Sequence, residues 1–312
     1  MQTDKQRPIV ILGPTASGKT RLAVQVARRV GGEIISADSR QVYRGMDIGT
    51  GKDLAEYQLD GKAIPYHLID IVDAGSSYNV YDFQQDFQRA IADIALRGRV
   101  PVVCGGTGLY LDAVLRGHQF TAIPVDEPVR AELQALTDEE LQERFQQFPS
   151  VYSEKADTST RKRLIRAIEI SSYLTQHPDT SLPAVAALPD ALIFGIDLPA
   201  DLRRERITRR LHERLQNGLV GEVEGLMRQG VSAEKLIFYG LEYKFITQYL
   251  LGELDYKTMT ARLETAIHQF AKRQMTFFRK MERDGLRIHW LDGRRSTPEL
   301  AESIFQFIKS YQ

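Results

Sequence analysis

The sequence has a single cysteine, a single tryptophan and no long apolar run. One cysteine, Cys104, excludes a disulfide framework and any zinc site built from several cysteines, and the six histidines show no paired spacing of metal ligands. Any bound metal is therefore expected on oxygen ligands. No apolar run approaches the ~20 residues that a membrane-spanning helix needs, so no membrane partner is expected.

The chain also has no excess of positive or negative residues. The 41 basic and 41 acidic residues give zero formal charge, which leaves only local groups of arginines as candidates for a nucleic-acid surface. With 43% hydrophobic and 26% charged residues, the 312-residue chain has the composition of a folded protein and the length of one large domain or of a core plus an insert. The start, MQTDKQRPIVIL, has no signal-peptide pattern and predicts a cytoplasmic location, with a monomer as the default state.

Short apolar runs alternate with helical patterns in the first part of the chain. This rhythm is typical of a parallel sheet with helices between its strands. Between Asp38 and Pro65 the pattern fails and four glycines mark a long loop, which is more often functional than filler. The predicted strands are 8–12, 33–37, 67–71 and 100–104, and the predicted helices are 19–30 and 80–96.

The chain becomes polar and helical from Thr121 to about Pro189, and a strand-like run at 192–197 then returns to the core. The rest is mostly helical and includes a long amphipathic stretch from about Thr258 to Arg283. We therefore expect an α/β fold with a parallel-sheet core, a helical insertion domain and a helical C-terminal part. The predicted core is 1–120 and 190–312, and the predicted insertion is 121–189.

The strongest motif is GPTASGKT at residues 13–20, which matches G-x-x-x-x-G-K-[ST] between a predicted strand and a predicted helix. Such a P-loop turns backbone amides and a helix N-terminus toward phosphate oxygens, with the lysine as a point charge and the last hydroxyl as a ligand for Mg²⁺. The alternative is an ordinary glycine-rich turn. A P-loop alone specifies a di- or triphosphate, which kinases, NTPases and pyrophosphate-releasing transferases all bind. The predicted diphosphate-binding residues are Gly13, Thr15, Ala16, Ser17, Gly18, Lys19 and Thr20, and Thr20 is the predicted metal ligand.

Asp38 follows the second predicted strand directly. In a doubly wound sheet, ligands bind beyond the carboxyl ends of the strands, so Asp38 is expected to face the P-loop. A carboxylate there can accept a proton from an incoming nucleophile, which makes Asp38 the candidate catalytic base. The alternative is a turn or helix cap before Ser39, and the two roles are compatible.

Arginines and lysines gather in three further places. Arg206 and Arg210 lie four residues apart on one predicted helical face, which Arg203 and Arg214 extend, and a guanidinium group suits phosphate oxygens. For each group the alternative is a solvated face paired with acidic neighbours. The two clusters that suit an RNA backbone are Arg161, Lys162, Arg163 and Arg166 in the insertion, and Lys272, Arg273, Arg279 and Lys280 near the end.

Taken together, the motifs resemble one family. GPTASGKT, DSRQVYRGMDIGTGK, HLIDIVD with SYNVYDF, and VCGGTGLYL are similar, in this order and spacing, to the tRNA dimethylallyltransferases, and the resemblance continues through TRKRLIRAIEI, RERITRRLHERLQNGLVGEV and FAKRQMTFFRK. It implies a P-loop α/β core with a helical insertion, a prenyltransferase activity, dimethylallyl diphosphate as donor and tRNA as partner. The dimethylallyl group would pass to N6 of the adenosine at position 37, next to the anticodon, and diphosphate would leave.

The resemblance also assigns roles to residues. Asp38 becomes the catalytic base, Thr15 a loop residue near the reacting centre, and Lys19 a catalytic charge on the leaving group. Arg206 and Arg210 would bind the diphosphate. The residues that it implies in tRNA binding are Asp38, Ser39, Arg40, Gln41, Thr107, Arg161, Lys162, Arg163, Leu164, Tyr239, Gly240 and Lys244.

Three segments depart from the common bacterial pattern of this family. Gly51, Lys52 and Asp53 stand where AKP is usual, YGLEYK at 239–244 stands where a segment close to GYRQ is usual, and a phenylalanine, at 277 or 278, replaces a tryptophan. Two alternatives therefore stay open: a P-loop small-molecule kinase that uses ATP, and a nucleotide-binding or RNA-binding protein without catalysis. The zinc finger of eukaryotic relatives is not expected in a chain with one cysteine.

Overall fold

The computed structural model describes residues 7–310 and divides the chain into two compact units. One unit contains residues 117–187, and the other, the core unit, contains the chain before and after it. Gly117 has a left-handed backbone with φ 68°, and the amide of Leu188 donates to the Leu115 carbonyl of the core at 3.3 Å. The insertion unit therefore begins and ends slightly before residues 121 and 189. The ends of the predicted core, residues 1–6 and 311–312, lie outside the described part.

The core unit is built on a six-stranded parallel sheet. Its strand order is β10-β9-β1-β8-β2-β6, so β1 lies between β9 and β8. Most of the strand residues are buried, which explains their nearly continuous apolar runs. The α/β fold class is confirmed. The strands are β1 (Ile9–Leu12), β2 (Glu33–Ala37), β6 (Tyr66–His67), β8 (Pro101–Gly105), β9 (Leu192–Asp197) and β10 (Ile288–Asp292).

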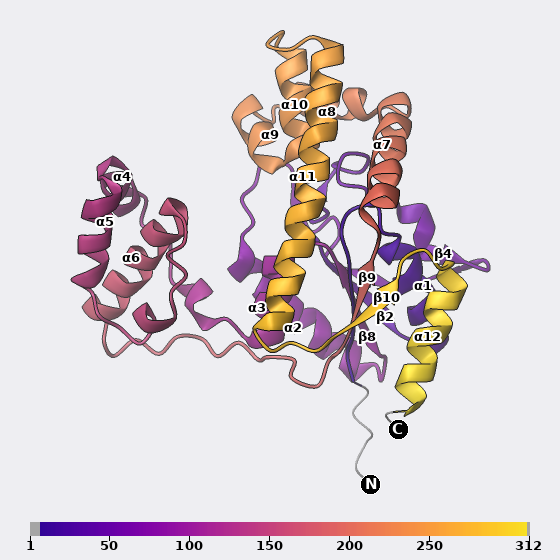
Figure 1. Cartoon of the computed structure of the whole chain (residues 1–312), viewed down its shortest axis with the longest axis horizontal. Coiled ribbons are helices and arrows are strands. Elements are labelled where there is room, and N and C mark those ends of the chain that lie inside the picture. The colour runs from indigo at the N-terminus through magenta and orange to yellow at the C-terminus, as the bar shows by residue number, and fades with distance from the viewer. Residues whose placement is uncertain (1–6, 311–312) are drawn as a thin grey trace. The chain divides into compact units, whose positions relative to one another are not determined.

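Helices cover both faces of the sheet (Figure 1). Ile9 and Ile11 of β1 belong to the buried cluster on one face, and Val10 and Leu12 belong to the cluster on the other, as the alternation of side chains along a strand requires. The helices of the first face are α1 (Lys19–Val30) and α12 (Thr297–Ser310). Those of the second face are α2 (Val80–Leu96), α3 (Gly108–Arg116) and the C-terminal part of α11 (Tyr256–Arg283).

A third apolar cluster lies among the helices that follow β9 in the chain. Leu263 of α11 belongs to this cluster, whereas Phe278 of the same helix belongs to the second face of the sheet. The long helix α11 therefore ties the helical part to the sheet, as Figure 1 shows. The other helices of this cluster are α7 (Ala200–Gln216), α8 (Leu219–Arg228), α9 (Ala233–Tyr239) and α10 (Leu241–Leu250).

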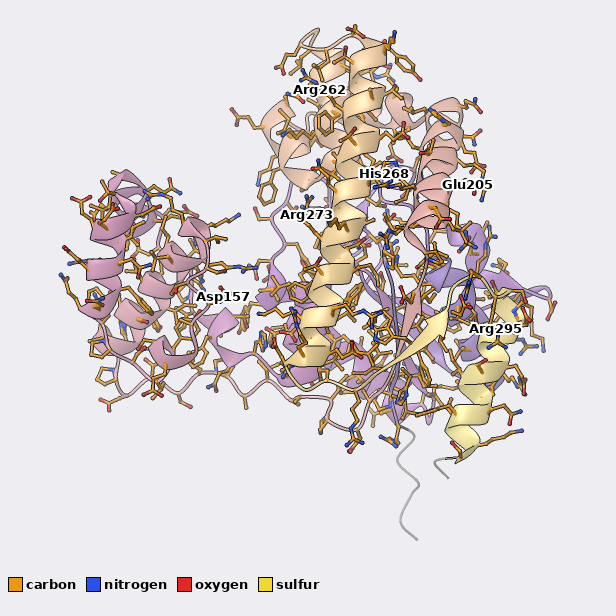
Figure 2. All side chains as sticks on the ribbon, in the orientation of Figure 1. Asp157, Glu205, Arg262, His268, Arg273 and Arg295 are labelled. Atoms are coloured by element: carbon orange, nitrogen blue, oxygen red, sulfur yellow. The ribbon has the colours of Figure 1, made fainter. Side chains whose placement is uncertain are left out.

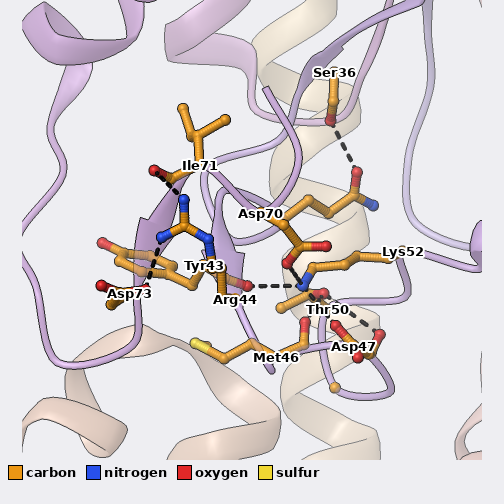
Figure 3. A network of polar contacts seen from close by, with 12 residues as sticks. Ser36, Tyr43, Arg44, Met46, Asp47, Thr50, Lys52, Asp70, Ile71 and Asp73 are labelled. Atoms are coloured by element: carbon orange, nitrogen blue, oxygen red, sulfur yellow. Dashed lines mark hydrogen bonds and ion pairs between the residues drawn. The ribbon is translucent and has the colours of Figure 1, made fainter. Parts of the chain in front are cut away.

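The long loop after β2 is held together by Lys52, whose side chain is fully buried (Figure 3). Its Nζ atom donates to the Tyr43 carbonyl at 2.7 Å and to the Asp47 carboxylate at 2.6 Å, and it pairs with the carboxylate of Asp70. A buried charge is tolerated only when it is paired and hydrogen-bonded in this way. Lys52 is therefore the centre of a structural network.

The strand predicted at 67–71 ends after His67. Leu68 and Asp70 have left-handed backbones, with φ 62° and 56°, which interrupt extended structure. The same turn brings the Asp70 carboxylate to Lys52. The short elements of this region are β3 (Tyr43–Arg44), η1 (Leu54–Tyr57), β4 (Gln58–Leu59), β5 (Lys62–Ala63) and β7 (Val72–Asp73).

The insertion unit is helical and has a core of its own, in which Leu133, Leu141 and Leu164 are buried. Arg130 donates hydrogen bonds of 2.7 and 2.8 Å to the two carboxylate oxygens of the buried Glu169. None of the helices in the described part of the chain has the length and apolar character to cross a membrane. The elements of this unit are η2 (Gln119–Ala122), α4 (Glu127–Ala135), α5 (Asp138–Gln146), η3 (Ser153–Lys155) and α6 (Arg161–Gln176).

Candidate active site

A cavity of about 1280 Å³ opens in the core unit, where the segments that follow β1, β2 and β8 meet. This is the edge of a doubly wound sheet at which ligands bind. All of the lining residues belong to the core unit. They come from 15–21, 38–41, 49–51, 53–56, 106–108, 239–243 and 293–297, with further residues from α7, α11 and α12 and with Asn217 directly after α7.

The P-loop is shaped by two left-handed residues, Ala16 with φ 60° and Gly18 with φ 85°. Gly18 precedes α1 without a side-chain cap, so the first amides of this helix keep their donors for an anion. The Ser17 hydroxyl oxygen is buried and has no hydrogen-bond partner within residues 7–310. Gly13 does not line the cavity, but a Cβ atom there would lie 2.7 Å from that oxygen, so Gly13 leaves room for the loop.

Lys19 begins α1 and lines the cavity. Burial lowers the pKa of its ammonium group, Asp38 opposes this effect, and the positive charges of Arg210 and Arg214 add to it. A desolvated cation that stands beside two other cations gains stability when an anion binds. The electrostatics of the P-loop therefore favour a phosphate ligand.

Asp38 lines the same cavity directly after β2. Its Oδ1 atom accepts a 2.9 Å hydrogen bond from the backbone N–H of Arg40, which makes a tight turn. Asp38 therefore both stabilises a turn and lines the cavity. The neighbouring loop is joined to this turn, because the Ser39 amide donates to the Thr107 hydroxyl at 3.0 Å.

The side chains of Arg40 and Gln41 differ in burial and in their hydrogen bonds. Arg40 is half-buried, and its guanidinium donates to the Phe238 carbonyl at 3.3 Å and lies 5.8 Å from the centre of the Phe238 ring. Gln41 is buried, accepts a hydrogen bond from the Ser36 hydroxyl at 2.8 Å and donates to the Gly51 carbonyl at 3.1 Å. Gln41 lines the cavity with a side chain that also fixes the loop.

Four arginines of α7 line the cavity: Arg206, Arg210 and Arg214 at successive helical turns, and Arg209 beside them in the sequence. Arg206 donates to the Gly293 carbonyl at 3.4 Å, and Arg210 forms a hydrogen bond with the Asp53 carboxylate. Arg203, which extends the same face in the sequence, is not among the lining residues. The predicted diphosphate arginines and the P-loop therefore face one cavity.

The segment 239–244 lines the cavity with residues 239–243. The Tyr239 ring is buried, its centre lies 4.4 Å from that of Tyr43, and its hydroxyl donates to the Ser76 carbonyl at 2.8 Å. Gly240 joins α9 to α10 at φ 140°, a conformation that favours glycine. Lys244 is exposed and is not among the lining residues, so the cavity meets Tyr239 and Gly240 but not Lys244.

The tRNA-binding residues predicted in the insertion all belong to the first turn of α6. Arg161 pairs with Asp138, and Leu164 is buried in the core of this unit. Arg163 pairs with Asp157 at 2.9 Å. Lys162 is exposed and forms no ion pair with the described residues.

Arg166 has a structural position in the same unit. Its guanidinium donates to the Ile123 carbonyl at 2.6 Å and the Pro124 carbonyl at 3.2 Å, and it pairs with Glu169 at 3.0 Å. These contacts join α6 to the segment before α4. We therefore separate Arg166 from the exposed cations of the cluster.

The residues of the basic cluster at 272–280 also differ in their surroundings. Arg273, labelled on α11 in Figure 2, lines the cavity. Arg279 instead pairs with Asp197 at 2.9 Å and lies over the Trp290 ring at 3.8 Å. Only part of this cluster therefore faces the cavity.

Sequence reasoning missed Gln274, which is buried on α11 and bridges two loops of the cavity. Its carboxamide accepts from the Thr15 amide at 2.9 Å and donates to the Gly106 carbonyl at 2.8 Å. A signal was present, since Gln274 is the one polar residue in the buried stripe of the helix. Asp53, Arg214 and Glu242 were also absent from the predicted site, and they line the cavity too.

Two family models match the chain. The IPP transferase model matches residues 41–281, and the isopentenyl transferase model matches residues 7–66. The chain belongs to the IPP transferase family. The resemblance found in the motifs is confirmed.

Several members of the IPP transferase family match nearly the whole chain. tRNA dimethylallyltransferase 1 of Porphyromonas gingivalis is 52% identical over 300 residues, which are 96% of this chain and 98% of that protein. tRNA dimethylallyltransferase 1 of Geotalea uraniireducens is 52% identical over 298 residues, 96% of each chain. The crystal structure of a tRNA isopentenylpyrophosphate transferase from Bacillus halodurans has a TM-score of 0.71 at 33% identity and covers 98% of this chain and 96% of that one.

Proposed function

We propose that this IPP transferase moves a dimethylallyl group from dimethylallyl diphosphate to N6 of adenosine 37 in tRNA and releases diphosphate. One observation carries the proposal: a desolvated lysine at an uncapped helix N-terminus and a carboxylate at the end of β2 line the same cavity. The first feature suits a diphosphate and the second suits proton transfer from a nucleophile. The full-length similarity to tRNA dimethylallyltransferases supports this reading over a small-molecule kinase.

The diphosphate would lie on the P-loop, against the amides of residues 18–20 and the charge of Lys19. Arg206 and Arg210 would add planar donors that match phosphate oxygens. These groups would stabilise the negative charge that develops on the leaving diphosphate in the transition state. Because the donors are already in place, they need not rearrange during the reaction.

Thr20 is the residue that we propose for Mg²⁺. Thr20 lines the cavity at the start of α1, and no group of three or more histidine, cysteine or carboxylate residues in the described chain forms a metal cage. This donor set fits Mg²⁺, which takes one or two protein oxygens and completes its shell with water and phosphate oxygens. When bound, the ion supplies positive charge to the departing diphosphate.

The N6 lone pair of adenine would attack C1 of the dimethylallyl group while the bond from C1 to the diphosphate oxygen breaks. Asp38 would accept the proton that N6 releases. Thr15 lies in the same cavity and is held at its amide by Gln274, so it is placed to shape the space around C1. Ser39 and Thr107, which are joined by a hydrogen bond, would contact the target nucleotide.

Residues outside the P-loop would hold the rest of the tRNA. We propose phosphate contacts for Arg161, Lys162 and Arg163 of the insertion and for the exposed Lys244, because such contacts position a nucleic acid without reading its bases. Since the Tyr239 ring is buried, its part would be to support Gly240 at the cavity. A monomeric state and a cytoplasmic location stay predictions.

The test uses the purified chain with Mg²⁺, labelled dimethylallyl diphosphate and unmodified bulk tRNA, followed by digestion to nucleosides and mass analysis. The proposal expects a prenylated adenosine. In a parallel reaction with ATP in place of dimethylallyl diphosphate, the proposal predicts that no ATP is consumed. Turnover of ATP without a prenylated nucleoside would replace the proposal by the kinase alternative.

A further inference from the structure

Asp53 is shared by two arginines of α7. Its Oδ2 atom accepts a hydrogen bond from Arg210 and lies 3.9 Å from the NH2 nitrogen of Arg214. Both guanidinium groups pack on Gly51, where any Cβ atom would overlap them. The loop thus brings one carboxylate to two neighbouring cations, and a glycine makes the approach possible.

Arg214 has the more unusual surroundings of the two. Its side chain is 13% exposed, and its NH2 nitrogen is buried without a hydrogen-bond partner among the described residues. The pKa of Arg214 is lowered to about 10, first by burial and then by the charge of Arg210, while Glu242 and Asp53 oppose the shift. A buried donor with no acceptor is costly, so its retention calls for a state in which it is used.

We infer that Asp53 passes from Arg210 to Arg214 when diphosphate binds. Arg210 leaves the carboxylate for a phosphate oxygen, and Arg214 closes the 3.9 Å gap and becomes the partner of Asp53. The inference rests on the proposed function and names a positioning residue within it: Arg214 does not touch the substrate but sets how readily Arg210 does.

Charge balance explains why the exchange helps binding. Without Arg214, the release of Arg210 would leave Asp53 as an unpaired carboxylate close to an incoming polyanion, which is unfavourable. With Arg214 in place, Asp53 stays paired before and after binding. Arg214 lines the cavity, but its buried NH2 nitrogen lies 3.9 Å from the Asp53 carboxylate, which favours pairing with Asp53 over direct contact with a phosphate.

The exchange also accounts for two departures from the common family pattern. Gly51 and Asp53 belong to the segment 51–53, and Glu242, which opposes the charge of Arg214, belongs to the segment 239–244. The two altered segments therefore meet at one arginine of α7. In this chain they form a linked set of charges beside the diphosphate site.

The test is a double-mutant cycle read by titration of inorganic pyrophosphate into the full chain. Arg214→Met removes the charge and keeps the length of the side chain, and Asp53→Asn removes the carboxylate that would be stranded. The exchange predicts that Arg214→Met weakens pyrophosphate binding about tenfold in the native background. In the Asp53→Asn background, Arg214→Met should weaken pyrophosphate binding less than about twofold, since no carboxylate can then be left without an ion-pair partner.

Two controls separate this from other roles of Arg214. Arg228→Met removes an exposed arginine of α8, which is absent from the cavity lining, and should leave binding unchanged. Arg214→Lys keeps a charge near Asp53 and should recover part of the affinity.

Equal losses in both backgrounds would overturn the exchange, because they would show that Arg214 attracts the diphosphate directly. Lower thermal stability with unchanged pyrophosphate affinity would also overturn it and leave Arg214 a packing residue. Absence of pyrophosphate binding by the unmodified chain would contradict the proposed function itself, and the exchange would fall with it.

Discussion

The Gln274 carboxamide oxygen lies 2.9 Å from the backbone nitrogen of Thr15 and accepts its hydrogen bond. The same side chain donates to the Gly106 carbonyl, so a residue of α11 fixes the P-loop against the loop that follows β8. The two loops are 168 residues or more from Gln274 in the sequence. Gln274 therefore couples the positions of these two loops.

Gln274→Met is expected to lower kcat about tenfold to 100-fold, because a small displacement of Thr15 misaligns the donor and the acceptor. Prenyl transfer to tRNA measures the effect. Gln269→Met is the matched control, since Gln269 is an exposed residue of the same helix. Equal activity of the two variants would remove Gln274 from this role.

Asp38→Asn separates proton transfer from the turn that Asp38 makes. Asparagine keeps an oxygen that accepts from the Arg40 amide but cannot act as a base at neutral pH. We expect kcat to fall by about 100-fold to 10,000-fold while pyrophosphate affinity is retained. A nearly normal rate constant for prenyl transfer in a single-turnover experiment would mean that another group accepts the proton.

Gly51→Ala is expected to destabilise the fold more than Gly61→Ala. Both glycines have left-handed backbones, with φ 63° and 70°, so both variants carry the cost of a Cβ atom in that conformation, about 1 to 2 kcal/mol. Only at Gly51 does the new atom overlap Arg210 and Arg214, whereas nothing lies within 4 Å at Gly61. Overpacking adds about 1 to 3 kcal/mol, which urea unfolding resolves. Equal losses would show that the arginines move aside freely.

Lys162→Glu should weaken tRNA binding and flatten its salt dependence, because fewer counterions are released when one phosphate contact is lost. The slope of log affinity against log salt should change by about 1. Arg166→Met should act differently: it breaks contacts with the Ile123 carbonyl and Glu169 and should lower the thermal stability. An unchanged salt slope for Lys162→Glu would make this residue an ordinary solvated lysine.

Glu33 predicts a pH dependence of stability. A side-chain hydrogen bond from Arg97 holds the pKa of the Glu33 carboxyl below its ordinary value of 4.5, and burial opposes the shift. A lowered folded-state pKa stabilises the fold above the unfolded-state value and loses that effect as the pH falls through the folded-state pKa. Glu33→Gln should therefore be less stable than the native chain at neutral pH by about 1 to 3 kcal/mol, and the difference should vanish in acid. A difference that persists in strong acid would contradict this origin.

The elements nearest the P-loop follow from local sequence signals. The helix predicted at 19–30 is α1 and the helix predicted at 80–96 is α2, because Gly31 ends the first and Asn79 caps the second. The strand predicted at 192–197 is β9. Apolar patterning and caps are local, so the sequence alone contains them.

Long-range polar contacts could not be predicted in this way. Lys52 reads as an ordinary surface lysine, yet it is buried because Asp47 and Asp70 converge on it. The link between Asp53 and Arg210 joins a loop to a helix 157 residues later. Such contacts depend on how the elements pack, and no single segment carries a signal for them.

The most direct test of the account is prenyl transfer to two transcripts of one tRNA that differ only at position 37. The account predicts that the native chain modifies the transcript with adenosine there and not the one with guanosine, and that Asp38→Asn slows the reaction by about 100-fold or more while pyrophosphate still binds. Equal labelling of both transcripts, or none by a chain that binds pyrophosphate, would contradict it.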